Sequence, residues 1–217
     1  MISPPNSPDS RINAAHGLSY WGDIAADENG MLGGVPSLAG FSSLSRIDLQ
    51  GSRTFLGIGV RRGREGVDLA LEGGAGIGRI PEGLLLKVAK QADIIEPVSK
   101  FTDKLKGKAG VRHIYNVGLE DWQPAADVIY DLIWVQWCVG HLTNEQLVGF
   151  LETCEGVLNS AGVIVLKENL STGDEDVFDA EDSRVMRRDE KFRSILEKAD
   201  LRLVARRAEG APRDEEQ

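Results

Sequence analysis

Runs of apolar residues alternate with amphipathic segments along most of the chain. Short apolar runs predict six strands, at residues 67–71, 93–96, 111–116, 129–137, 162–169 and 201–206. Apolar positions at helical spacing predict four helices, at residues 79–91, 100–107, 143–158 and 192–199. Thr143 and Gln146 match the capping box that begins a helix. Strands that alternate with helices favour right-handed crossovers, so we expect an α/β fold with a doubly wound, mostly parallel sheet.

The two ends of the chain differ in composition from this central part. Residues 1–18 contain three of the eight prolines and little apolar material, so we expect a disordered leader. Residues 19–56 combine aromatic residues, a glycine-rich loop and a short amphipathic stretch, which predicts a partly helical extension. The main domain is expected at residues 57–207, followed by a disordered tail at residues 208–217.

Charge and cysteine content exclude several classes of protein. The formal net charge of −9 argues against a nucleic-acid partner and favours cationic peptides or small molecules. The two cysteines, Cys138 and Cys154, fit neither a disulfide framework nor a zinc site, so no metal is expected. The sequence has no signal-peptide pattern and no apolar run of membrane length. We therefore expect a cytoplasmic monomer without a membrane partner, with the nucleus as a second location.

A glycine-rich segment, "EGGAGIGR" at residues 72–79, follows the first expected strand. Ligands of open parallel sheets bind beyond the carboxyl ends of the strands, and glycines let the backbone approach them closely. The dinucleotide fingerprint G-x-G-x-x-G fails, because its last glycine would fall on Arg79 when counted from Gly74. The spacing acidic-x-G-x-G-x-G instead resembles the first motif of methyltransferases that depend on S-adenosyl-L-methionine (SAM).

An acidic residue ends the second expected strand. Glu96 lies 22 residues after Gly74, where a carboxylate is placed to accept hydrogen bonds from both hydroxyls of a ribose. A glycine-rich turn without a ligand and a dinucleotide site are the two alternatives, and the position of Glu96 favours SAM over both.

The fourth expected strand has an unusual end, in the stretch "DLIWVQWCVGHL" at residues 131–142. Its first half is the continuous apolar run of a buried parallel strand. Gln136, Trp137 and His141 then follow, from which a plain core strand gains nothing. Taken singly, Trp137 is explained as a core residue and His141 as a helix-entry residue. Since the fourth strand lies beside the first in such a sheet, we expect these side chains to border the same pocket.

Six motifs occur in an order and at distances that resemble the protein α-N-terminal methyltransferase family. They are "SYW…GMLGG", "GAGIGRI", "GLEDW", "IWVQWCVGHLT", "VLKEN" and "DAEDSRVMRRDE", and they extend from Ser19 to Arg207. The resemblance implies the class I SAM-dependent methyltransferase fold, with SAM as cofactor. It also implies methylation of the α-amine of proteins that begin X-Pro-Lys or X-Pro-Arg once the initiator methionine is removed. The implied partners are such N-terminal peptides, for example those of ribosomal proteins.

The resemblance also implies roles for single residues. Arg79 would pair with the carboxylate of SAM and Glu96 with its ribose, while the segment around Trp21 would cover the substrate channel. The implied cofactor-binding residues are Gly74, Arg79, Glu96, Leu119, Glu120 and Gln136. The implied substrate-binding residues are Trp137, Asn169, Asp179, Trp21 and Leu32, and the implied catalytic residues are His141 and Asp182.

The chemistry of methyl transfer needs these residue types. The nucleophile must be a neutral amine, but an α-amine with a pKa of about 7.7–8.0 is roughly nine tenths protonated at pH 7. A histidine with an ordinary pKa of about 6.5 can take up the proton, helped by a nearby carboxylate, which suits His141 and Asp182. The acidic run at residues 173–183 would give a cationic peptide a favourable field.

The sequence departs from the family pattern in three respects. Arg184 stands where the family tends to have a small hydroxyl residue, and it could pair with Asp179 or Asp182 and weaken a preference for a basic third residue. Glu72 and Glu96 stand where many relatives have aspartate. The class I fold has seven strands in the order 3-2-1-4-5-7-6, and no seventh strand can be written here, so we expect the final antiparallel strand to be missing.

Three other functions share part of this pattern. A small-molecule SAM-dependent methyltransferase and a non-catalytic SAM-fold binding protein would both have the glycine loop and Glu96. Neither explains the joint presence of the QW-x-x-GHL motif, the KEN motif and the acidic run. A nicotinamide-dependent oxidoreductase is disfavoured by the glycine spacing. We therefore expect an N-terminal protein methyltransferase.

Overall fold

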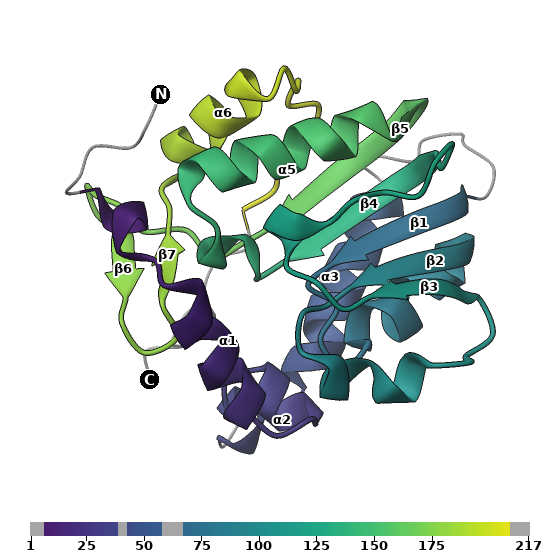
Figure 1. Cartoon of the computed structure of the whole chain (residues 1–217), viewed down its shortest axis with the longest axis horizontal. Coiled ribbons are helices and arrows are strands. Elements are labelled where there is room, and N and C mark those ends of the chain that lie inside the picture. Colours follow the sequence, from purple (N-terminus) through teal and green to yellow (C-terminus); the bar gives the residue numbers. More distant parts are fainter. Residues whose placement is uncertain (1–6, 39–42, 58–66, 209–217) are drawn as a thin grey trace, which may run out of the picture.

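The computed structural model describes residues 7–38, 43–57 and 67–208 of the 217-residue chain. Its centre is a parallel five-stranded sheet in the order β3-β2-β1-β4-β5 (Figure 1). The strands are β1 (Val67–Gly73), β2 (Ala89–Ile95), β3 (Val111–Tyr115), β4 (Tyr130–Gln136) and β5 (Leu158–Lys167). This sheet confirms the doubly wound α/β fold expected from the sequence.

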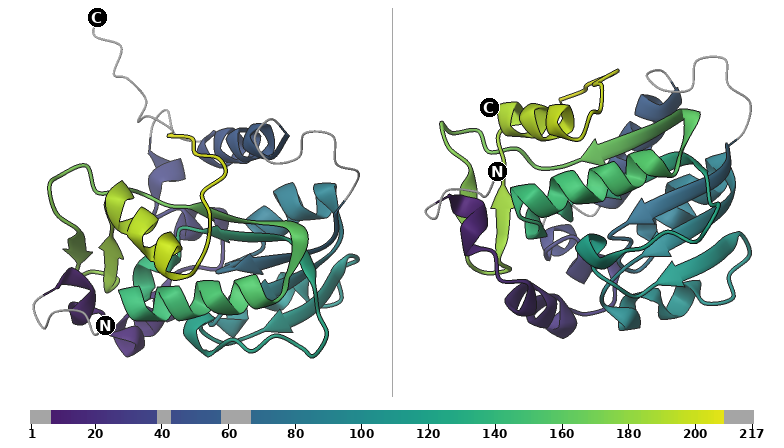
Figure 2. Two further views of the ribbon diagram at one scale, coloured as in Figure 1. Left: turned by 90° about the horizontal axis from the view of Figure 1, so that it is seen from above. Right: turned by 45° about the horizontal axis from the view of Figure 1, so that its top comes forward.

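Helices cover both faces of the sheet (Figures 1 and 2). On one face lie α5 (Asn144–Gly156) and α6 (Asp189–Lys198), and on the other lie α3 (Leu44–Phe55), the π-helical turn Pro81–Leu85 and α4 (Leu86–Val88). The remaining helical elements are α1 (Ala14–Asp23), α2 (Glu28–Met31) and the 3-10 helices Pro8–Arg11, Val35–Ser37, Ser99–Leu105, Leu119–Asp121 and Val139–His141. In these described ranges, none of the helices has both the length and the apolar character needed to cross a membrane.

Strand β4 is buried on both faces, which explains its unbroken apolar run. Leu132 and Trp134 belong to the core on the α3 side, whereas Ile133 and Val135 belong to the core on the α5 side. A strand covered by helices on both faces loses the alternation of apolar and polar residues that a half-exposed strand keeps. Helix α5 begins with the predicted capping box: the Thr143 hydroxyl accepts from the Gln146 backbone, and the Gln146 side chain accepts from the Thr143 backbone.

The strand register brings the ends of three strands to one edge of the sheet. Gly73 at the end of β1 lies between Ile95 of β2 and Val135 of β4. Gln136 at the end of β4 lies beside Lys167 at the end of β5. The loops that leave β1, β2 and β4 therefore begin side by side, which is where ligands of parallel sheets bind.

The second strand begins earlier than the sequence predicts. The helix expected at residues 79–91 ends at Val88, and β2 already begins at Ala89 rather than at residue 93. Ala89 is paired with Val67 at the start of β1. Backbone pairing with the neighbouring strand therefore overrides the helical spacing of the apolar side chains.

The sixth strand predicted at residues 201–206 is wrong. Residues 201–208 have no regular secondary structure, although Leu201 packs against the core and Arg206 binds Asp189 of α6 at 2.8 Å. Leu203 and Val204 are exposed, so their side chains gain no burial that would favour a strand. Within the described part of the chain, β5 is consequently the last strand at its edge of the sheet.

A short antiparallel hairpin was not predicted. Strand β6 (Val177–Asp179), within the acidic run, pairs with β7 (Arg184–Met186), which follows it. Ser183, at the turn side of β7, has a positive φ of 59°. The hairpin lies beside α1 and the first 3-10 helix (Figure 1).

The disordered leader predicted at residues 1–18 is wrong for residues 8–18; residues 1–6 lie outside the described residues. Residues Pro8–Arg11 form a 3-10 helix, and α1 begins at Ala14. Asp9 is buried, and its carboxylate accepts a hydrogen bond of 2.9 Å from the Asn144 backbone at the start of α5. Arg11 stacks on Phe178 of β6 at 4.3 Å. Specific polar contacts order this segment despite its lack of apolar residues. The predicted tail at residues 208–217 lies outside the described residues except for residue 208.

The contact of Asp9 gives a test of this docking. We expect Asp9→Ala to lower the free energy of unfolding by about 1–3 kcal/mol, because the part-buried Asn144 N–H loses its acceptor. It should also speed tryptic cleavage after Arg11. Glu152→Ala, an exposed change on the middle of α5, serves as control in thermal melts and timed digestion. Equal cleavage rates in the two variants would contradict the docking role of Asp9.

Candidate active site

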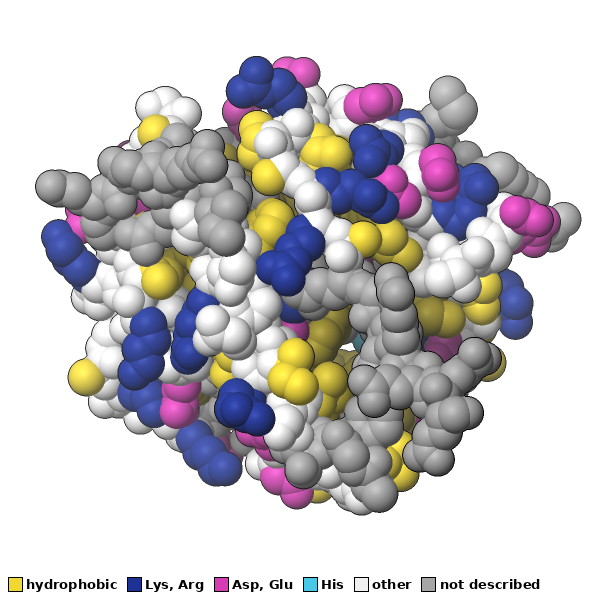
Figure 3. Space-filling model, turned by 180° about the vertical axis from the view of Figure 1, so that it is seen from behind, with side chains coloured by type: hydrophobic (Ala, Val, Ile, Leu, Met, Phe, Trp, Pro, Cys, Tyr) yellow, Lys and Arg dark blue, Asp and Glu magenta, His cyan; other side chains and the backbone are white. Residues whose placement is uncertain are grey.

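A cavity of about 380 Å³ lies beyond the carboxyl ends of β1, β2 and β4, and helix α1 forms part of its lining. Figure 3 shows a hollow bordered by hydrophobic side chains on the face opposite to the view of Figure 1. Apolar residues dominate the cavity wall, among them Leu18, Val98, Phe101, Leu119 and Leu142. Most of the polar lining groups come from these three strand ends and the loops that follow them. The others are Asn13 before α1, Glu120 and Asp121 after β3, and Ser183 before β7.

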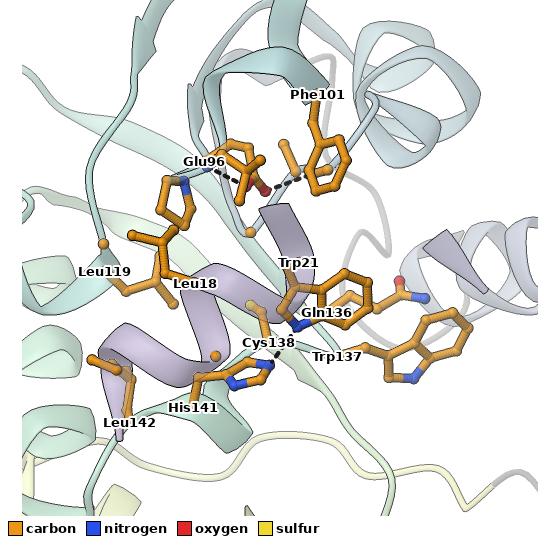
Figure 4. A pocket seen from close by; sticks show the side chains of 18 of the residues that line it. Leu18, Trp21, Glu96, Phe101, Leu119, Gln136, Trp137, Cys138, His141 and Leu142 are labelled. Carbon is orange, nitrogen blue, oxygen red and sulfur yellow. Dashed lines mark hydrogen bonds between the residues drawn. The ribbon is translucent and has the colours of Figure 1, made fainter. Parts of the chain in front are cut away.

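The glycine loop and Glu96 form one side of the cavity. Gly74, Gly76 and Gly78 all have positive φ angles, of 71°, 52° and 87°, a conformation that side chains other than glycine rarely adopt. The Glu96 carboxylate accepts 2.8 Å hydrogen bonds from the backbone N–H groups of Gly76 and Val98, one on each oxygen (Figure 4). Burial raises the pKa of Glu96, against the effect of these two bonds.

Two neighbours fix the shape of this loop. A Cβ added to Gly74 would lie 2.5 Å from the Cys138 sulfur, and one added to Gly76 would lie 2.8 Å from the Met31 sulfur. The loop therefore packs between Cys138, which follows β4, and Met31 of α2. Neither glycine position has room for a larger residue.

Glu72 also lines the cavity, although the sequence assigned no role to it. Its side chain is 1% exposed, and its Oε2 atom has no hydrogen-bond partner among the described residues. Burial raises the pKa of Glu72 well above its usual value. A buried carboxyl oxygen without a partner is costly, so a donor group of a bound ligand would stabilise it.

Arg79 and Gln136 meet at a carboxylate that the sequence analysis missed. Asp48 of α3 accepts from Arg79 Nη1 at 2.5 Å, from Gln136 Nε2 at 3.1 Å and from Lys167 Nζ at 2.5 Å. Burial opposes the charge of Asp48, but the bonds from Lys167 and Arg79 outweigh it and lower its pKa. The only sequence signal was spacing, because Ser45, Asp48 and Ser52 share one helical face, all buried.

The predicted adenine-binding residues lie on the apolar side. Leu119 is buried and lines the cavity, and Glu120 lines it with an exposed side chain. In Figure 4, Leu119 and Glu96 lie toward the same end of the cavity, and Phe101 lies beyond Glu96.

Trp137 stands at the opposite end from Leu119 (Figure 4). Its φ angle of 57° is strained for an aromatic residue. The Arg79 guanidinium lies 5.2 Å and the Lys167 ammonium 5.9 Å from the centre of its ring. The backbone N–H of Trp137 donates to the Lys167 carbonyl at 2.9 Å. These contacts hold an uncommon backbone conformation at the end of β4.

His141 faces Trp21 of the covering helix α1. The indole Nε1 donates to His141 Nε2 at 3.2 Å, and the two rings are edge to face with centroids 6.3 Å apart (Figure 4). Burial, followed by the positive charge of Arg184, lowers the pKa of His141 to about 4. His141 is therefore a neutral histidine whose acceptor nitrogen is occupied by Trp21, and a weaker base than an ordinary histidine would be.

The two acidic candidates, Asp179 and Asp182, do not line the cavity. Asp182 is buried with its Oδ2 atom 3.8 Å from His141 Nε2, and burial raises the pKa of Asp182. Arg184 pairs with both acids, at 3.4 Å from Asp179 and 3.4 Å from Asp182. The pairing predicted from the sequence is thus confirmed.

Two predicted substrate residues stand apart from the cavity. Asn169 is exposed and does not contribute to its lining. Leu32 is buried outside the lining, while its neighbour Met31 reaches the cavity.

Among the described residues, no group of three or more histidine, cysteine and carboxylate side chains is arranged to hold a metal ion.

The sheet order, the glycine loop after the first strand and the acidic end of the second strand define a SAM-dependent methyltransferase of class I. A family described as AdoMet-dependent proline di-methyltransferase matches residues 9–215. The chain belongs to this family.

Relatives and solved structures agree with this assignment. The chain is similar to alpha N-terminal protein methyltransferase 1 of Schizosaccharomyces pombe, at 40% identity over 87% of this chain and 84% of the relative. It is 38% identical to N-terminal Xaa-Pro-Lys N-methyltransferase 1 of Homo sapiens, over 86% of this chain and 83% of the relative. A SAM-dependent methyltransferase of Leishmania major superposes with a TM-score of 0.79 at 31% identity, over 93% of this chain and 78% of that chain.

The cavity fits SAM. Its volume lies in the range of about 300–1,000 Å³ that is usual for small-molecule sites. Each Glu96 oxygen accepts one backbone N–H and keeps capacity for a ribose hydroxyl, because a carboxylate has about four acceptor positions. The Oε2 atom of Glu72 is a further buried polar atom in the lining that has no hydrogen-bond partner within the described ranges.

Replacement of Glu96 by glutamine tests the ribose site. We expect Glu96→Gln to weaken SAM binding at least about tenfold, because its amide would face a backbone N–H and only one oxygen could still accept. Isothermal titration calorimetry measures the dissociation constant. Glu152→Gln, an exposed change on α5 outside the cavity lining, should change it by less than about threefold. Equal losses in the two variants would contradict the assigned site.

The electrostatic setting of His141 has its own test. We expect Arg184→Ser to raise the pKa of His141 above about 4, because a positive charge that disfavours the protonated ring is removed. The ring-proton chemical shifts of the three histidines, followed by NMR against pH, give the midpoint. The control, Arg188→Ser, removes an arginine paired with Glu190 and should leave the titration midpoint of His141 unchanged. A midpoint that does not move in Arg184→Ser would show that the guanidinium does not act on His141.

Proposed function

We propose that the protein transfers methyl groups from SAM to the α-amine of protein N-termini that begin X-Pro-Lys or X-Pro-Arg after removal of the initiator methionine. One observation carries the proposal: the glycine loop, Glu96, Trp137 and His141 all line one cavity. The names of the relatives, at 38% and 40% identity, support the same acceptor.

Residues of the sheet edge would hold the donor. Glu96 would take the ribose and Leu119 with Glu120 the adenine, while Gly74 and Arg79 would hold the methionine part near Gln136. Bound SAM supplies a methyl group that is already activated, so the protein's task is to position the amine and to keep it neutral.

The proton of the amine is assigned to His141 and Asp182. An incoming amine could replace the Trp21 N–H at His141 Nε2, which is an acceptor in this arrangement. The low pKa of His141 keeps this acceptor unprotonated at neutral pH. Asp182, 3.8 Å from the same nitrogen, would stabilise the positive charge that the ring gains. Trp137 would form the wall beside the substrate's proline, and Trp21 and Leu32 would belong to the cover.

Arg184 shapes the proposed range of substrates. Asp179 and Asp182 would face the cation at the third position, but Arg184 already pairs with both of them. A cationic side chain of the substrate must compete with this guanidinium. We therefore expect a weaker preference for lysine or arginine at the third position than two unpaired carboxylates would give. Asn169 would bind the substrate's backbone outside the cavity.

The cellular setting is part of the proposal. The protein would act as a monomer in the cytoplasm, and also in the nucleus, on N-terminal peptides such as those of ribosomal proteins. It would act without a nucleic-acid or membrane partner, in keeping with the net charge of −9.

A peptide assay tests the function. Incubated with SAM, an X-Pro-Lys peptide should gain one, two or three methyl groups by mass spectrometry. Acetylation of its α-amine should abolish turnover, and replacement of its proline by leucine should slow it sharply. A peptide with an internal lysine and a blocked terminus is the control. Equal methylation of that control would identify a different kind of methyltransferase.

A further inference from the structure

Helix α3 buries an unusual face. At the spacing of one helical stripe it buries Ser45, Asp48 and Ser52, with 7%, 5% and 1% exposure. A helix packed on a sheet normally buries an apolar stripe, and α3 does contribute Leu49 and Phe55 to the core beside it. Departures from a local folding rule without a gain in packing tend to mark functional positions.

The partners of Asp48 come from three separate strand ends. Arg79 follows β1, Gln136 ends β4, and Lys167 ends β5. Arg79 and Gln136 line the cavity, whereas Asp48 and Lys167 do not. Asp48 therefore stands behind the wall and acts on the cavity through the side chains that it binds.

The same network extends to Trp137. Both cations held by Asp48 lie against its ring, at 5.2 Å for Arg79 and 5.9 Å for Lys167. Trp137 has a strained backbone, which persists only where neighbouring contacts support it. One carboxylate thus fixes an arginine on the donor side and a tryptophan on the acceptor side.

We propose that Asp48 is a positioning residue that aligns Arg79 with the donor and, through Arg79 and Lys167, Trp137 with the acceptor. This inference rests on the proposed function. Without Asp48, Arg79 and Lys167 would lose the carboxylate that holds their two positive charges near the Trp137 ring, and Gln136 would lose the acceptor for its amide. Helix α3 would then support the site from outside the cavity wall, in addition to the cover that α1 forms.

Asp48→Asn tests the donor half. An asparagine keeps the size of the side chain, but its amide would face the N–H donors of Arg79, Lys167 or Gln136. We expect the dissociation constant of SAM to rise at least about tenfold, measured by calorimetry without peptide. In an Arg79→Ala background the same change should add little, because it acts through Arg79. Asp48→Glu, which keeps the charge, should recover part of the affinity.

Asp93→Asn is the matched control. Asp93 is likewise buried and accepts from an arginine, Arg112, at 2.5 Å, but it does not line the cavity or touch Arg79. We expect Asp93→Asn to lower the melting temperature and to leave the dissociation constant of SAM near that of the unchanged protein. If Asp48→Asn lowers only the melting temperature, as the control does, Asp48 is merely structural and the proposal is wrong.

Lys167→Gln tests the acceptor half and does not depend on the folding of Asp48 variants. It removes one cation from the Trp137 ring and leaves Arg79 paired with Asp48. We expect the Michaelis constant of an X-Pro-Lys peptide to rise by about threefold or more, with a smaller change for SAM. An unchanged peptide constant would overturn this half. Absence of SAM binding in the unchanged protein would instead refute the proposed function, so the two failures are distinguishable.

Discussion

Parallel pairing of β1 with both β2 and β4 is the constraint on which the site depends. It fixes Gly73 between Ile95 and Val135, so the glycine loop, Glu96 and Gln136 all emerge at one edge. The loops need no long reach, because the sheet has already brought their starting points together. The hydrogen bond from Gly76 to Glu96 then joins two of these loops into one surface. A shift in register would separate them, which makes the apolar packing of the sheet a condition for ligand binding.

The carboxyl groups around this edge differ in pKa because their hydrogen-bond and ion-pair partners differ. Asp48 binds two cations and has a lowered pKa. Glu72 has one oxygen without a hydrogen-bond partner in the described part of the chain, and its pKa is strongly raised. Glu168 accepts from the Val139 backbone, yet burial raises its pKa to about 7. Burial alone would neutralise all of them, so each charge that remains near the cavity reflects a specific donor.

Much of the fold could be predicted from the sequence, and the failures have local causes. β1, β3, β4 and β5 were recognisable from their short apolar runs, and α5 was recognisable from the capping box that begins at Thr143. The segment at Leu201 has the pattern of a strand, but nothing in the described residues pairs with it. The order of residues 8–18 rests on contacts such as Asp9 with Asn144, 135 positions apart, which no local pattern reveals.

Some residues of the candidate site could likewise be predicted from the sequence, and others could not. Glu96, Arg79, Gln136, Trp137 and His141 were found because they lie in motifs at strand ends, where the fold class alone indicates a pocket. Asp48 lies in no motif, and its importance follows only from what converges on it in space. The same holds for the state of His141. The sequence suggests that His141 is an ordinary base. In the structure, burial and Arg184 keep its ring neutral, and its Nε2 atom accepts a hydrogen bond from the Trp21 N–H. The sequence thus identifies which groups can react, and their buried partners determine the form in which they meet a substrate.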